Sequence, residues 1–287
     1  MEQALAGSIK RVVCSAIALL FLTLAAASPT MGARTLDIRG NRLILDGRRG
    51  LILYRSSGDL DGDGVRETVF AGWTYDEKFC GIMVARPVHR GWRLIATAGT
   101  PTCQLHADVT DINGDRKLEI VVRSISGDGH GLCSIFVLDR SRLREIGFFD
   151  ATRFRDLDGD GAQEVLSRRM VSFGFIGDHW LTIWKWNGRG YTDVSLRFPR
   201  QYDSVIEDLQ RVIREIQYTT RYGSKHSPES NPDMFADLYH YLGKAYEYRR
   251  LPEKARQQYA IAYRLDPADF EKRNAAAFHR TWKHVHK

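Results

Sequence analysis

The sequence has few cysteines and a single long apolar run. Four of its 287 residues are cysteine, and no Cys/His spacing typical of a zinc site occurs. The apolar run covers Val12 to Ala27, and no other stretch could span a membrane. The Gly-x-Ser-x-Gly elbow, the phosphate loop, the dinucleotide fingerprint and His-Glu-x-x-His are all missing. The chain carries no recognisable catalytic centre, so we expect it not to be an enzyme.

Positive and negative charges are mixed along most of the chain. The net charge is +7 and the isoelectric point about 9.3, but the basic residues are scattered among acidic loops and β-rich segments. A solvated surface accounts for this pattern, so we expect no nucleic-acid partner. With 43% hydrophobic and 27% charged residues, the composition is that of a soluble globular protein of one large domain or two smaller ones.

The apolar run has the organisation of a secretory signal peptide. Lys10 and Arg11 precede it, and Ala25-x-Ala27 is a plausible cleavage motif. The run is short for a membrane span of roughly 20 residues, which argues against the alternative of an uncleaved anchor. We assign residues 1–33 to a signal peptide and expect a periplasmic or secreted protein, with no stable membrane insertion after cleavage.

Three cysteines remain after the leader, namely Cys80, Cys103 and Cys133. Export permits disulfides, and an odd number allows at most one bond within the chain. We expect Cys103 to be a member of that pair. Its partner is Cys80 or Cys133, and the sequence does not distinguish them.

Three short acidic segments carry the clearest chemical pattern. They begin at residues 59, 111 and 156, and each has an oxygen-bearing side chain at positions one, three, five and nine. In a tight turn these side chains, with a backbone carbonyl near position seven, can surround Ca²⁺. The expected side-chain ligands are Asp59, Asp61, Asp63 and Glu67; Asp111, Asn113, Asp115 and Glu119; and Asp156, Asp158, Asp160 and Glu164. The expected carbonyl ligands belong to Val65, Lys117 and Ala162.

An EF-hand and a plain β-turn are the two alternatives to this calcium site. An EF-hand requires a bidentate Glu at position twelve, where this chain has Phe70, Val122 and Ser167. A plain β-turn without metal is the second alternative, because Asp, Asn and Gly are common turn residues. Clustered like charges repel one another unless a cation or hydrogen bonds compensate them, which favours the metal site.

The segment from residue 35 to residue 198 has a β pattern that repeats. Short runs rich in Val, Ile, Phe, Trp and Tyr are separated by Gly, Asp and Asn. The acidic segments are spaced by 52 and 45 residues (111 − 59 and 156 − 111), and a β-run follows each. About four strands in about fifty residues are typical of one propeller blade.

These acidic segments, each followed by a strand, resemble the FG-GAP or VCBS-type repeat of integrin α-subunit propellers and many exported bacterial proteins. The resemblance covers about residues 50–198. It implies a partial or small β-propeller-like array of four-stranded blades over residues 34–199, with Ca²⁺ in its loops. The chain has room for three blades and a fraction, and we expect residues 35–54 to supply a fourth, partial blade.

The three acidic segments are not equivalent. The second has Asn113 at position three, and Arg116 where the others have glycine at position six. If position six requires a left-handed backbone, Arg116 is strained there by about 1 kcal/mol. Arg116 and Lys117 also weaken the field at an ion, so we expect the second site to bind Ca²⁺ most weakly.

Residues 200–287 have a helical pattern. Val205, Leu209, Val212 and Ile216 fall on one helix face. Eight later positions resemble one tetratricopeptide repeat over residues 236–269, with helices near 205–216 and 270–285 on either side. These positions are Tyr239, Leu242, Gly243, Tyr246, Ala255, Tyr259, Ala262 and Pro267. The resemblance implies binding of a peptide or partner protein; the alternative is that the helices cap the β-domain or mediate self-association.

Together these patterns predict an exported, calcium-binding, non-catalytic protein-interaction or scaffolding protein. Its fold is expected to be mostly β, with a tetratricopeptide-like helical hairpin at the C-terminal end. The first alternative is a carbohydrate-binding, lectin-like propeller that uses the alternating Trp180, Trp184 and Trp186 to bind a glycan. A hydrolase with an unrecognised site is the third hypothesis.

Overall fold

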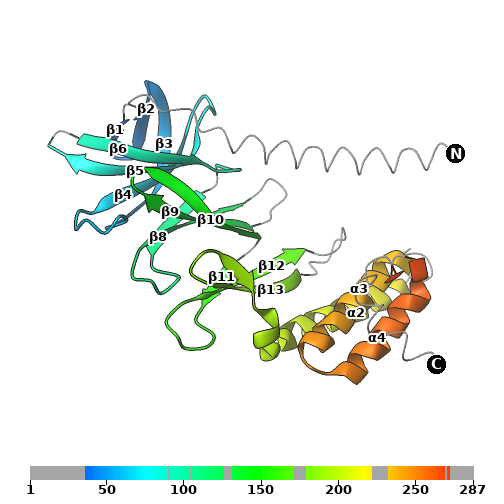
Figure 1. Ribbon diagram of the computed structural model, residues 1–287. Coiled ribbons are helices and arrows are strands. Elements are labelled where there is room, and N and C mark those ends of the chain that lie inside the picture. Colours follow the sequence, from blue (N-terminus) through cyan, green and yellow to red (C-terminus); the bar gives the residue numbers. More distant parts are fainter. Residues whose placement is uncertain are drawn as a thin grey trace.

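The computed structural model describes most of the chain after residue 35. The described residues are 36–89, 91–103, 105–125, 131–150, 152–170, 179–221, 232–268 and 270–271. The predicted signal peptide and most of the helix expected over 270–285 lie outside them. Within them the chain is mostly β, with helices at its C-terminal end, so this part of the expected fold class is confirmed (Figure 1).

The strands form three antiparallel sheets in chain order. The first contains β1 (Leu36–Arg39), β2 (Arg42–Leu45), β3 (Arg48–Gly58), β4 (Glu67–Thr74), β5 (Cys80–Val88) and β6 (Gly91–Gly99). The second contains β7 (Leu105–Thr110), β8 (Glu119–Ile125), β9 (Gly131–Asp139) and β10 (Arg142–Asp150). The third contains β11 (Thr152–Arg155), β12 (Glu164–Met170), β13 (His179–Trp186) and β14 (Tyr191–Asp193).

A four-stranded unit recurs in these sheets. In β3–β6, β7–β10 and β11–β14, each strand pairs with the next, and an acidic segment connects the first strand to the second. We call residues 59–67, 111–119 and 156–164 the first, second and third acidic loops. Each loop connects the first strand of its unit to the second strand. The regular spacing of the loops in the sequence is therefore the length of one unit.

The expected fourth, partial blade is wrong. The strands β1 and β2 extend the first sheet, and β1 approaches β6, so that this sheet curls into a half-barrel. The reason lies in the connection between β2 and β3. Asp46 and Gly47 both have positive φ angles, of 52° and 76°, which suits a tight hairpin turn and forces β2 to pair with β3.

The core lies between the sheets, and the second strand of a unit is buried on both faces. In β8, Ile120 and Val122 pack against the first sheet, whereas Val121 packs toward the third sheet with Ile135 and Val165. Successive side chains of a strand point to opposite faces, so a continuous apolar run fits a strand between two neighbours.

Within the described residues, three α-helices follow the third sheet. They are α2 (Tyr202–Arg221), α3 (Pro232–Tyr248) and α4 (Pro252–Leu265), preceded by the short helices η1 (Ser195–Arg197) and η2 (Pro199–Gln201). Their apolar faces share one core with Trp180, Leu181 and Ile183 of β13. None of the helices in the described ranges is long and apolar enough to cross a membrane.

The close packing of α3 on α4 depends on a glycine. A Cβ atom built at Gly243 would lie 2.7 Å from two ring carbons of Tyr259. Gly243 therefore leaves no room for a side chain where α3 packs on α4. Ala255 of α4 is another small residue of this pair of helices and is 4% exposed.

The disulfide joins Cys80 to Cys103, with Cα atoms 5.3 Å apart. It ties the start of β5 to the connection after β6. Cys133 is a buried free thiol. The structure thus chooses between the two pairings that the sequence left open.

We predict that Tyr202→Phe loosens the helices from the third sheet. The buried Tyr202 hydroxyl donates a hydrogen bond to the Leu181 carbonyl oxygen at 2.8 Å, and its loss leaves that acceptor without this donor. Urea unfolding should show a loss of about 1–2 kcal/mol in the free energy of unfolding. Tyr75→Phe changes an exposed tyrosine and is the control. Equal stability of the two variants would contradict the prediction.

Candidate metal centre

The first aspartate of each acidic loop organises the turn. In the first loop the two carboxylate oxygens of Asp59 accept hydrogen bonds from the backbone N–H groups of Gly62 (2.8 Å) and Gly64 (2.9 Å). Asp111 and Asp156 do the same in the other loops, with Gly114 and Arg116 and with Gly159 and Gly161 as donors. Side chains that hydrogen-bond to nearby backbone in this way hold a turn closed.

The fifth position pins the end of each turn. Asp63 accepts a hydrogen bond from the backbone N–H of Val65 at 2.8 Å. Asp115 and Asp160 accept the corresponding bonds from Lys117 (2.8 Å) and Ala162 (3.0 Å). The residues expected to offer carbonyl ligands are thereby anchored through their backbone N–H groups.

Backbone conformation explains why glycine occurs at positions four and six of the loops. Positions four and six have positive φ angles in all three loops; at position six they are 84° for Gly64, 67° for Arg116 and 90° for Gly161. The left-handed backbone expected at position six is confirmed. Arg116 is the non-glycine residue among them, and it bears the strain that glycine avoids.

The glutamate at position nine is the buried member of each loop. Glu67, Glu119 and Glu164 are 0%, 1% and 0% exposed, and each begins the second strand of its unit. One oxygen of each accepts a hydrogen bond from the backbone N–H at position two, at 2.9, 3.0 and 2.7 Å in chain order. A buried carboxylate needs further compensation, because removing a charge from water costs several kcal/mol.

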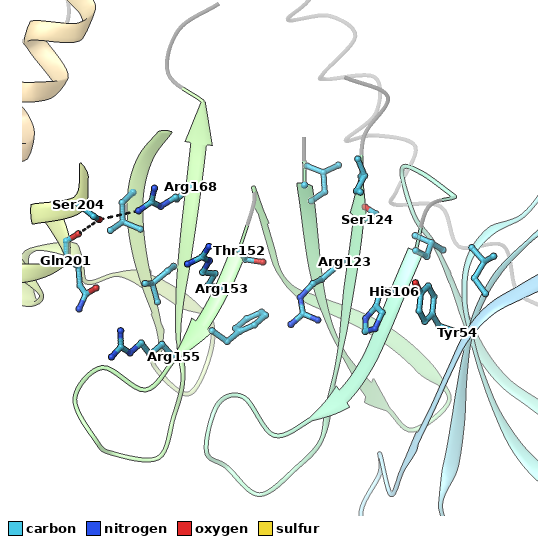
Figure 2. Close-up of a pocket in the computed structure, with 18 residues that line it drawn as sticks. Tyr54, His106, Arg123, Ser124, Thr152, Arg153, Arg155, Arg168, Gln201 and Ser204 are labelled. Atoms are coloured by element: carbon cyan, nitrogen blue, oxygen red, sulfur yellow. Dashed lines mark hydrogen bonds between the residues drawn. The ribbon is translucent and has the colours of Figure 1, made fainter. Parts of the chain in front are cut away.

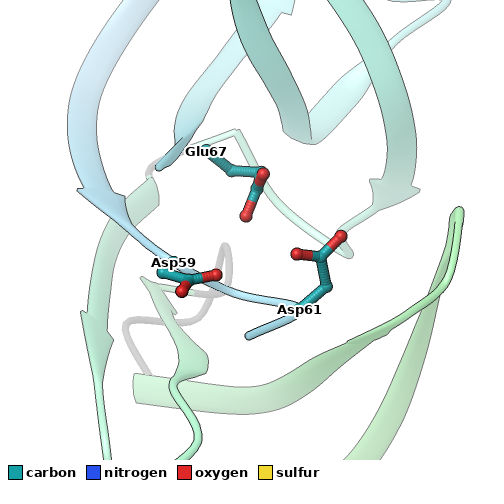
Figure 3. A group of neighbouring side chains, drawn as sticks. All are labelled: Asp59, Asp61 and Glu67. Atoms are coloured by element: carbon teal, nitrogen blue, oxygen red, sulfur yellow. The ribbon is translucent and has the colours of Figure 1, made fainter. Parts of the chain in front are cut away.

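Two loops gather carboxylates closely enough to bind a metal ion. Oxygen atoms of Asp59, Asp61 and Glu67 lie within 4.8 Å of one another, and Figure 3 shows these side chains around a common space. Asp156, Asp158 and Glu164 form the equivalent group in the third loop. Asp63 and Asp160 are not members of these groups. In the second loop Asn113 stands at the third position, so its group has one carboxylate fewer.

In the first loop a basic side chain contacts the carboxylates. Arg86 of β5 is opposite Glu67, because Thr68 pairs with Ala85 in the register. Its guanidinium contacts Glu67, Asp61 at 2.7 Å and Asp63 at 2.8 Å. The hydrogen bond to Glu67 raises the pKa of Arg86 above its ordinary value.

The third loop uses a lysine in the same place. Lys185 of β13 is opposite Glu164, since Val165 pairs with Trp184. Its Nζ atom contacts Asp158 (2.8 Å), Asp160 (2.8 Å) and Glu164 (2.6 Å). Burial alone would lower the pKa of Lys185, but the hydrogen bonds to the three carboxylates raise it above its usual range.

The second loop has no cation at this place. The residue opposite Glu119 is Val137, because Ile120 pairs with Phe136. Glu119 instead accepts a hydrogen bond from the Asn113 amide at 2.9 Å. Burial raises the pKa of Glu119 to about 7, and the nearby charges of Asp115 and Asp111 act in the same direction.

The two basic residues could not be predicted from the loop sequences alone, because they lie on the third strand of their units. The signal that could have found them is the hairpin register, which brings the residue opposite position nine over the loop. A metal ion in the first or third loop would compete with Arg86 or Lys185 for the same carboxylates. The expected order, with the second site weakest, stays a prediction, and this competition acts against it.

The three tryptophans of β13 are packing residues. Trp180 is 9% exposed and contacts the rings of Tyr202, Tyr241 and Tyr248 at centroid distances of 5.5, 5.6 and 5.4 Å. Trp184 packs near Phe149 (5.8 Å) and Trp186 near Tyr191 (5.4 Å). Trp180 is thus unavailable for stacking on a sugar ring.

Comparison with known proteins returned no match for the chain, either among protein-family models or among curated proteins.

We predict that Arg116→Gly stabilises the protein by about 1 kcal/mol, because glycine adopts the positive φ of this position without strain. Lys117→Gly is a matched control: it removes a neighbouring positive charge at a position without positive φ. Chemical denaturation in chelator measures both variants. If the control stabilises the protein as much, charge rather than backbone strain is responsible.

We predict that, in chelator, Glu119 makes the protein less stable as the pH rises. Its pKa is about 7 in the folded protein against an ordinary 4.5, so its contribution is fully present below about pH 4.5 and is lost through pH 7. The loss amounts to about 3 kcal/mol. Denaturation curves of Glu119→Gln should lack this decline, whereas Glu145→Gln, at an exposed site on β10, should keep it. If the stability of Glu119→Gln falls with rising pH as much as that of the wild type, Glu119 does not cause the decline.

Proposed function

We propose that this chain is an exported, calcium-binding, non-catalytic protein that binds a partner protein or peptide. The observation that carries the proposal is the repetition of one acidic loop at the same connection of three four-stranded units. A loop that only closes a hairpin needs no buried glutamate and no group of convergent carboxylates. Retaining both in the first and third loops is expected if the loops bind a cation.

Calcium is the metal that best suits these donors. The groups contain oxygen ligands alone, and Ca²⁺ accepts six to eight oxygens in flexible geometry. Arg86 and Lys185 have long side chains that can withdraw from the carboxylates when an ion enters. We propose that the loops use these side chains as internal cations and exchange them for Ca²⁺ outside the cell.

The proposal also draws on the two family resemblances. The units β3–β6, β7–β10 and β11–β14 would be blades of an FG-GAP or VCBS-type array, and α3 and α4 would form one tetratricopeptide-like repeat. The tight contact of Gly243 with Tyr259 supports the second resemblance. Helix hairpins of this type and blade surfaces both offer binding surfaces for partners.

Export is supported by the bond between Cys80 and Cys103. Disulfides persist in the periplasm and outside the cell but are rare in a reducing cytosol. The predicted leader over residues 1–33 points to the same compartment.

We predict that Ca²⁺ at 10 mM raises the melting temperature by several degrees relative to chelator. With dissociation constants on the order of 10⁻⁴–10⁻³ M, each occupied site stabilises the fold by about 1–3 kcal/mol. Asp59→Ala and Asp156→Ala should each reduce the shift, and Asp37→Ala, an acidic change outside the loops, should not. An unchanged melting temperature in the wild type would refute the calcium proposal.

The variants Arg86→Gln and Lys185→Met test whether the basic side chain and the calcium ion compete for the same carboxylates. In chelator each variant leaves buried carboxylates without their cation and should melt at a lower temperature. Calcium should restore a larger part of the stability in these variants than in the wild type, because its competitor is gone. A calcium response smaller than that of the wild type would show that the side chain and the ion do not compete.

A further inference from the structure

A groove crosses all three sheets and ends at the start of α2. Its volume is about 1160 Å³, and residues of β3, β7, β8, β9, β11 and β12 line it (Figure 2). This volume exceeds that of most small-molecule pockets and suits a segment of several residues. The groove is separate from the acidic loops, since no loop residue lines it.

The lining of the groove is positively charged. It includes Arg123, Arg153, Arg155 and Arg168 but no aspartate or glutamate within the described chain. Arg123 pairs with Asp108 at 2.5 Å, and Arg168 pairs with Asp208 at 3.2 Å. Such a surface attracts an anionic ligand.

Two arginines of the groove keep their guanidinium groups available. Arg153 and Arg155 are exposed, and neither has a hydrogen bond or an ion pair to another described residue. Guanidinium groups bind carboxylates through two parallel hydrogen bonds. These two side chains therefore present the groove's main unsatisfied capacity for a ligand.

The arginines are spaced as alternate residues of a strand. Arg153 and Arg155 lie on one face of β11, about 6.6–6.8 Å apart along the strand direction. β11 is the end strand of the third sheet, so one of its edges has no strand partner in that sheet. All four of its residues line the groove. An unpaired strand edge offers backbone donors and acceptors to an added strand.

We propose that this groove binds an extended acidic peptide, which adds to the free edge of β11 and places carboxylates at alternate positions opposite Arg153 and Arg155. The backbone edge favours a peptide over other polyanions, because a glycan or a nucleic acid cannot continue the strand pairing. Tyr54, which is 42% exposed, and His106 lie with ring centroids 4.4 Å apart and provide an aromatic surface at the β3 side of the groove.

This inference rests on the proposed function as a partner-binding protein and names the chemistry of the partner. The calcium proposal and the groove proposal can be refuted independently of each other. Calcium dependence is measured by melting temperature, whereas groove binding is measured with a peptide in saturating calcium and again in chelator. Peptide binding without any calcium response would leave the groove proposal standing and remove the calcium one.

The test uses the full chain and two fluorescein-labelled peptides of equal composition. One is Thr-Glu-Thr-Glu-Thr-Glu-Thr-Glu, and the other is Thr-Glu-Glu-Thr-Thr-Glu-Glu-Thr, in which no two glutamates are two residues apart. Fluorescence anisotropy should show that the alternating peptide binds about tenfold more tightly, since only it matches the arginine spacing. Arg153→Gln/Arg155→Gln should abolish this preference.

Arg142→Gln/Arg144→Gln is the matched control. These arginines are also exposed and two residues apart, on β10, which is an end strand of the second sheet and does not line the groove. The control should bind the alternating peptide as the wild type does. The proposal is overturned if the two peptides bind equally, if both double variants lose affinity alike, or if polygalacturonate competes as strongly as unlabelled alternating peptide.

Discussion

The structure depends on placing a buried glutamate at the start of the second strand in each four-stranded unit. Glu67, Glu119 and Glu164 are 0%, 1% and 0% exposed, and an uncompensated charge at such a site costs several kcal/mol. The loop before each glutamate supplies a backbone N–H, and a further group comes either from the third strand of the unit or from the loop. Loop conformation, strand register and charge are thereby coupled in each unit.

A different group compensates the buried glutamate in each of the three units. Arg86 compensates Glu67, Lys185 compensates Glu164, and the amide of Asn113 donates to Glu119. The second unit thus combines a hydrogen-bonded glutamate with an arginine at a left-handed position, and it lies between the other two sheets. We propose that bound Ca²⁺ supplies the same positive charge more strongly, so that export into a calcium-rich medium completes the fold.

Much of this arrangement could be predicted from the local sequence. The acidic loops, the strands after them and the left-handed position six follow from side-chain spacing and glycine placement, which depend on a few neighbouring residues. The contacts of Arg86 and Lys185 could not be predicted from the loops, because they arise from hairpin register about twenty residues later in the chain. The predicted separate blade failed for a similar reason. Residues 36–45 extend the first sheet, because the Asp46-Gly47 turn decides which sheet β2 joins. The pairing of Cys80 with Cys103, and the groove itself, require the sheets to be assembled.

The central claim is that the first and third acidic loops each hold a calcium ion among their carboxylates. A crystal structure of residues 34–287 grown in calcium, with anomalous difference maps, tests it most directly. The account predicts an anomalous peak among Asp59, Asp61 and Glu67 and another among Asp156, Asp158 and Glu164, with Arg86 and Lys185 turned outward. Maps without a peak in either group, and with both basic side chains still on the carboxylates at high calcium, would contradict it.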